Sequence, residues 1–159
     1  MAIKENAFTA LAEEIVRSFG EVRLRLLGTS MAPALLPGDV VSVRRAKLDE
    51  ISVGEIVLFA RAGRFFVHRV VSTCTASVMP SLITQGDRLG HDDPPVNSCE
   101  FLGRIVSIER GNRKVGIAKS RSNRLLARLL QSSEWATCLY VRLIAGWGSL
   151  HVPKGGCQA

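Results

Sequence analysis

The chain has 159 residues, of which 47% are hydrophobic and 22% are charged, and its formal net charge at pH 7 is +7. This composition predicts one folded domain with at most a small appendage, and it excludes a disordered chain. The positive charge gathers over residues 104–128, where Glu109 is the one acidic residue. Such an excess favours an anionic partner, which is a membrane surface or nucleic acid.

The first 20 residues predict a short amphipathic helix that ends at Gly20. Its apolar face is formed by residues at helical spacing, which are Phe8, Leu11, Ile15 and Phe19 with Ala12 and Val16 beside them. Acidic residues at positions 5, 13 and 14 argue against a secretory signal peptide and against a membrane span here.

Residues 21–118 predict a mostly β domain. The stretch 21–27 alternates strictly between apolar and charged residues, which is typical of a half-buried strand. Further runs rich in β-branched and aromatic residues follow at 39–45, 55–60, 64–72, 81–84 and 101–110. Turn sequences separate these runs at intervals near ten residues, so we expect a compact β-barrel or sandwich.

Residues 119–150 predict a C-terminal helical segment, and residues 151–159 a tail. Arg142 lies near the middle of the apolar stretch 135–153, which argues against a membrane span. The segment joins an apolar face to a cluster of cations, so it either covers the β core or contacts an anionic membrane peripherally. No localisation follows from the sequence beyond cytoplasmic or peripheral membrane.

The cysteines give no sign of a metal site. They lie far apart, without CxxC or Cys/His spacing, at Cys74, Cys99, Cys138 and Cys157. Structural zinc ligands come in close pairs, so we expect no metal and no cofactor.

Three segments carry side chains of the kinds that take part in nucleophilic catalysis. "GTSMAPALLPGD" (28–39) presents Ser30 in a loop framed by prolines and a Gly-Asp turn. "FFVHRVV" (65–71) carries His68, and an imidazole is a suitable base for a serine hydroxyl at neutral pH. "QGDRLGHDDPP" (85–95) offers three carboxylates, Asp87, Asp92 and Asp93, any of which could orient the imidazole.

Taken in order, these segments resemble the three conserved boxes of the signal peptidase I family, over residues 27–108. The resemblance implies a serine peptidase with Ser30 as nucleophile and His68 as general base. It assigns the third role to Asp93, with Asp87 as the alternative or as a structural acid. Because His68 stands where bacterial members and the related self-cleaving repressors carry lysine, the chain resembles the endoplasmic-reticulum and archaeal type.

Three features depart from the family pattern. A charged helix takes the place of the usual N-terminal membrane anchor, and the third box lacks its asparagine-rich ending. Gly28 occupies a position where some members supply a hydroxyl to the oxyanion, so the Ser30 N–H and Thr29 are the expected donors. Met31 is expected to anchor the loop or to line the pocket.

Three functions remain open from the sequence. The first is a serine endopeptidase that acts on a peptide or protein substrate after small residues. The second is a self-cleaving regulator, with Ala10–Ala12 as a candidate cleavage site. The third is a non-catalytic binding module that uses the basic C-terminal half, although nucleic acid is not the partner we expect.

Overall fold

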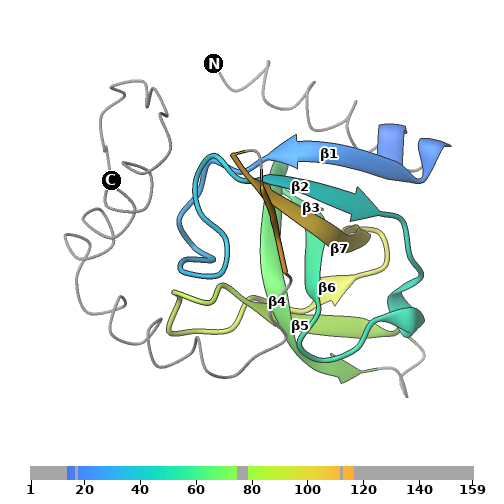
Figure 1. Ribbon diagram of the computed structural model, residues 1–159. Helices are drawn as coiled ribbons and strands as arrows, with labels where there is room; N and C mark the ends of the chain where they lie inside the picture. Colours follow the sequence, from blue (N-terminus) through green and yellow to red (C-terminus); the bar gives the residue numbers. More distant parts are fainter. Residues whose placement is uncertain (1–13, 17, 75–78, 112, 117–159) are drawn as a thin grey trace.

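The computed structural model describes residues 14–16, 18–74, 79–111 and 113–116. These residues form one antiparallel sheet in the order β1-β2-β7-β3-β4-β5-β6, with β8 paired to β7 (Figure 1). The strands are β1 (Glu21–Arg25), β2 (Val40–Arg44), β3 (Ile56–Arg61), β4 (Arg64–Cys74), β5 (Ser81–Gln85), β6 (Val96–Asn97), β7 (Phe101–Arg110) and β8 (Arg113–Val115). The expected mostly β fold is therefore confirmed, in the form of a single eight-stranded sheet.

Each predicted apolar run forms a strand, because alternating or continuous apolar residues suit a sheet buried on one face or on both. The strand β1 shows the expected alternation, with Val22 and Leu24 half-buried between exposed charged residues. The sequence did not predict the 3-10 turn η1 (Leu48–Glu50), the short strand β6 or the short strand β8.

The core lies on both faces of the central strand β3. Ile56 and Leu58 belong to one cluster of buried side chains, together with Met31 and Val16. Val57 and Phe59 belong to a second cluster. Both faces of β3 are covered, and for that reason its sequence reads as an uninterrupted apolar run.

The N-terminal helix is described over residues 14–16 and 18–19, and the Gly20 N–H bonds to the Val16 carbonyl at 3.1 Å. Gly20 has a φ of 76°, the left-handed conformation with which helices commonly end. Val16 is buried in the core as expected, but the Phe19 side chain is 81% exposed. The prediction that Phe19 lies on the buried face of the helix is therefore wrong. Phe19 is in the last turn of the helix, directly before the start of β1.

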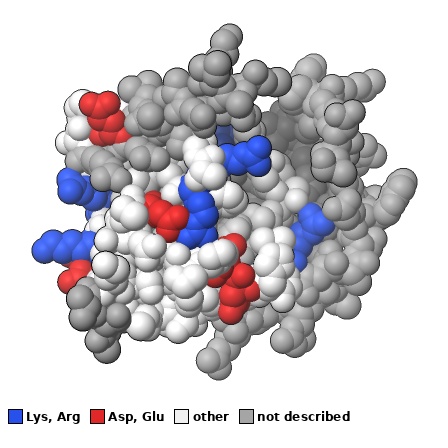
Figure 2. Space-filling view, turned by 180° about the vertical axis from the view of Figure 1, so that it is seen from behind, with Lys and Arg blue, Asp and Glu red and all other residues white. Residues whose placement is uncertain are grey.

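On the face shown in Figure 2, the cationic and anionic side chains of the described residues lie beside one another rather than in one basic patch. No helix within the described ranges is long and apolar enough to cross a membrane. The predicted C-terminal helical segment (119–150), the tail (151–159) and the candidate cleavage site Ala10–Ala12 lie outside the described residues.

Candidate active site

The Ser30 loop is closed at its base by main-chain bonds between its two ends. The Leu26 N–H bonds to the Asp39 carbonyl at 2.8 Å, and the Gly38 N–H bonds to the Leu26 carbonyl at 2.8 Å. The buried Asp39 carboxylate accepts from the Leu36 N–H at 2.8 Å and from two guanidinium nitrogens of Arg110 at 2.9 and 2.8 Å. The Pro-Gly-Asp turn of the sequence therefore fixes the loop that carries Ser30.

The loop after β5 supports the main chain of Ser30. The Arg88 N–H donates to the Ser30 carbonyl at 2.9 Å. Gly86 approaches the same carbonyl so closely that a Cβ at this position would stand 2.8 Å from the Ser30 oxygen. The loop after β1 and the loop after β5 thus lie side by side (Figure 1).

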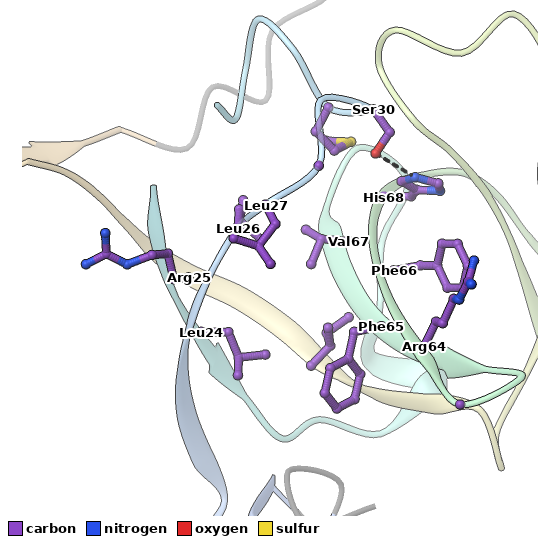
Figure 3. A pocket seen from close by; sticks show the side chains of 14 residues that line it. Leu24, Arg25, Leu26, Leu27, Ser30, Arg64, Phe65, Phe66, Val67 and His68 are labelled. Atoms are coloured by element: carbon purple, nitrogen blue, oxygen red, sulfur yellow. Dashed lines mark hydrogen bonds between the residues drawn. The ribbon is translucent and has the colours of Figure 1, made fainter. Parts of the chain in front are cut away.

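A continuous series of hydrogen bonds joins Ser30, His68 and Asp93. The His68 Nε2 atom lies 3.1 Å from the Ser30 hydroxyl (Figure 3), and the His68 Nδ1 atom lies 2.6 Å from Asp93 Oδ2. An ionised carboxylate accepts a hydrogen bond from Nδ1–H, which leaves the Nε2 lone pair facing the hydroxyl. The geometry is thus that of a hydroxyl, a base and an orienting acid.

His68 is buried, with 3% of its surface exposed, on strand β4. The rings of Phe59 and Phe66 meet it edge-on, each with its centroid 6.0 Å from that of the imidazole. Two aromatic walls and one carboxylate therefore determine the orientation of the imidazole.

Asp93 is held by the neighbouring strand. The Asp93 N–H donates to the Thr84 carbonyl at 2.8 Å, and the Thr84 hydroxyl donates to Asp93 Oδ2 at 2.7 Å. Asp87, by contrast, forms a bidentate pair with the Arg69 guanidinium at 2.8 and 2.7 Å, and Asp92 is exposed. Of the three candidate acids, the structure brings Asp93 to the imidazole.

A cavity of about 630 Å³ opens beside Ser30 and His68, between the end of β1 and the first half of β4 (Figure 3). Its lining is mostly apolar and includes Leu24, Leu26, Leu27, Met31, Leu58, Phe65, Phe66 and Val67. Met31 is buried in the core and lines this cavity, so it combines the two roles considered for it. Thr29 is not part of the lining, and its hydroxyl oxygen accepts a bond from Arg88 at 2.8 Å.

Sequence reasoning did not single out Thr84, Arg69 or Arg88 as part of the site. Thr84 had a detectable signal, because it shares the inward face of β5 with the buried Leu82. A hydroxyl at such a position needs a hydrogen-bond partner. Among the described residues, no group of three or more His, Cys, Asp or Glu side chains could hold a metal ion.

Comparison with known protein families agrees with the observed fold. The family model described as Peptidase S24-like matches residues 2–106. The chain therefore belongs to the Peptidase S24-like family, which is a class of serine peptidases and related proteins. A search of curated proteins finds no match for this chain.

Proposed function

We propose that this protein is a serine endopeptidase of the Ser/His type, similar to signal peptidases, which cleaves a peptide or protein substrate after small residues. The observation that carries the proposal is the hydrogen-bonded series Ser30–His68–Asp93 at the edge of an apolar cavity. The preference for small residues follows from the resemblance to the signal peptidase family.

The mechanism follows from the positions of the three side chains. His68 Nε2 takes the proton of the Ser30 hydroxyl while the oxygen attacks the carbonyl carbon of the scissile bond. The Asp93 carboxylate stabilises the imidazolium that forms, and His68 then donates its proton to the leaving amine. Water attacks the acyl-enzyme by the same route and releases the second product.

The oxyanion of the tetrahedral intermediate needs hydrogen-bond donors close to Ser30. The main-chain N–H groups of Ser30 and Met31 donate to no other group of the described chain, so both remain available. Backbone donors fixed before reaction contribute strongly to such catalysis. Thr29 is a weaker candidate, since its side chain is bonded to Arg88 and lies outside the cavity lining.

The substrate main chain has an edge to pair with. Strand β5 pairs with β4 from Arg69 to Cys74. In the described sheet, the residues of β4 from Arg64 to His68 pair on one side, with β3, while their other side borders the cavity. An extended peptide can add to such an edge, which brings a main-chain carbonyl to Ser30.

The test is a peptide-library cleavage assay with wild type and Ser30→Ala, accompanied by intact mass measurements over time. We expect cleavage after small residues by wild type and none by Ser30→Ala. A wild-type chain that shortens itself near residues 10–12 and spares every added peptide would favour a self-cleaving regulator. Equal cleavage by the two proteins would contradict the proposal.

A further inference from the structure

Asp93 is followed directly by two prolines, and this limits how its position can be fixed. Proline has no main-chain N–H, so the main chain of Pro94 and Pro95 can form hydrogen bonds only through its carbonyl oxygens. The Asp93 N–H is already bonded to the Thr84 carbonyl. Hydrogen bonds to the two prolines themselves must therefore come from a donor that reaches their carbonyls, while the next residue, Val96, is buried and paired with Leu82.

Arg61, the last residue of β3, supplies these donors. Its Nη1 atom lies 3.2 Å from the Pro94 carbonyl, and its Nη2 atom lies 2.9 Å from the Pro95 carbonyl. The planar guanidinium presents several donors in a fixed arrangement, which allows one side chain to hold two consecutive carbonyls.

Arg61 is itself fixed on two other sides. Glu100 accepts from its Nε atom at 2.6 Å and from Nη2 at 2.8 Å, and the guanidinium lies 5.4 Å from the centre of the Phe59 ring. Phe59 stacks on Phe66 with ring centroids 5.3 Å apart. The same two rings flank His68, so Arg61 rests on the wall that orients the imidazole.

The charges of the pair reinforce this arrangement. The hydrogen bonds that Arg61 donates to Glu100 raise the pKa of Arg61 and hold the pKa of Glu100 below its ordinary value. The negative charge of Asp93 also favours the charged form of Arg61 and so raises its pKa. The guanidinium is therefore close enough to sense the acid of the site, although Arg61 is not part of the cavity lining.

We propose that Arg61, braced by Glu100, is a positioning residue that fixes the Asp93–Pro95 segment and thereby keeps the Asp93 carboxylate on His68. The expected effect of Arg61 on kcat rests on the proposed peptidase function. The expected effect of Arg61 on the hydrogen bond between Asp93 and His68 does not depend on any substrate. Arg61 acts through Asp93 and touches no reacting atom.

The kinetic test is a double-mutant cycle on peptide cleavage with wild type, Arg61→Met, Asp93→Asn and the double variant. Arg61→Met should lower kcat by about tenfold to a hundredfold with little change in KM, since small displacements of catalytic groups are costly. In the Asp93→Asn background the same change should cost no more than about twofold, because the two effects act through one group. If Arg61→Met lowered kcat in the Asp93→Asn background by the same factor as in wild type, the proposal would be overturned.

Two further variants separate positioning from folding. Arg61→Lys keeps the charge but cannot hold both carbonyls and the carboxylate at once, so its kcat should fall between wild type and Arg61→Met. Arg44→Met removes an arginine of β2 that pairs with Glu21 of β1 at 3.4 Å, and β7 separates these two strands from β3, so this variant should leave kcat unchanged. If Arg61→Met does not fold, Arg61→Lys is judged by the same cycle.

The structural test needs no substrate. In protein labelled with ¹⁵N-histidine, the proton on His68 Nδ1 should give a low-field NMR signal, assigned by its loss in His68→Gln. Arg61→Met or Arg61→Lys should weaken or shift this signal, and Arg44→Met should not. If wild type cleaves nothing while the signal depends on Arg61, the peptidase proposal fails and the positioning role stands. A signal unchanged in both Arg61 variants would overturn the positioning role.

Discussion

Among single residues, Gly86 can be used to test how the position of Ser30 affects catalysis, because there is no room for a side chain at this position. A Cβ there would stand 2.8 Å from the Ser30 carbonyl oxygen and 3.0 Å from the Leu89 side chain. Gly86→Ala should therefore displace Ser30 from His68 and lower kcat/KM by about a hundredfold. Gly90→Ala is the matched control, since a Cβ there meets nothing within 4 Å. Peptide cleavage at equal rates by the two folded variants would contradict this role of Gly86.

Replacement of Asp93 should affect kcat, whereas replacement of Asp87 should affect the free energy of unfolding. Asp93→Asn removes the carboxylate bonded to His68, so kcat should fall on the order of a hundredfold or more while the fold persists. Asp87→Asn removes the carboxylate charge that pairs with the Arg69 guanidinium, in a site where the two side chains are 9% and 13% exposed. This should lower the free energy of unfolding by about 3 kcal/mol.

Chemical denaturation and steady-state kinetics on both variants check this division. The assignment of roles would be reversed if Asp87→Asn lost turnover at full stability while Asp93→Asn remained active.

At the scale of elements, β3 is joined to the segment before β7 by the Arg61–Glu100 pair, and this junction should respond to acid. Arg61 lowers the pKa of Glu100 below its ordinary value of 4.5 in the folded chain. The Glu100 carboxylate therefore binds a proton more readily in the unfolded state than in the folded state. For this reason the ion pair stabilises the fold at pH values above 4.5. The stabilisation is lost as the pH falls through the lowered pKa.

Thermal unfolding of wild type and Glu100→Gln between about pH 7 and about pH 3 measures this contribution. The wild type should have the higher midpoint near neutral pH, and the two midpoints should converge in acid. A difference that stays constant over the whole range would show that the charge of Glu100 does not stabilise the junction.

The longer strands could be predicted from the sequence because their periodicity reflects burial. The alternation of β1 and the continuous apolar run of β3 both correspond to the observed exposure. The strands β6 and β8 could not be predicted, because two or three residues carry no periodic signal and pair only where β5 and β7 offer an edge. The exposure of Phe19 depends likewise on where the helix ends relative to the sheet.

The site was partly predictable for a related reason. Ser30 and His68 stand in recognisable local sequences, but three acids lie within the same short loop, and only contacts with distant residues separate them. Thr84 holds Asp93, whereas Arg69 holds Asp87. Arg61 and Arg88 resemble ordinary solvated arginines in the sequence, because their partners lie in loops that the fold brings to them.

At the scale of the whole molecule, the sequence of the C-terminal segment leads us to propose reversible binding to anionic bilayers. Lys119, Arg121, Arg124 and Arg128 precede an apolar stretch that contains aromatic residues. Each cation near an anionic surface contributes about 1 kcal/mol. Wild type should co-sediment with acidic vesicles at low salt, less so at high salt, and not with neutral vesicles.

The variant for this test replaces Arg121, Arg124 and Arg128 by Glu, which should abolish co-sedimentation without changing the circular dichroism spectrum. Wild type that remains in the supernatant with acidic vesicles at low salt would show that the segment does not bind membranes.

In the proposed mechanism, Ser30 and His68 act as one catalytic unit. This can be measured by comparing kcat/KM of peptide cleavage for wild type, Ser30→Ala and the double variant Ser30→Ala/His68→Gln. Residues that act as a unit are not additive, so loss of the nucleophile should cost as much as loss of both. We therefore predict no detectable cleavage above background by either variant and cleavage by wild type. Cleavage that persists in Ser30→Ala, or that falls further when His68 is also replaced, would show that the two residues do not act as one unit.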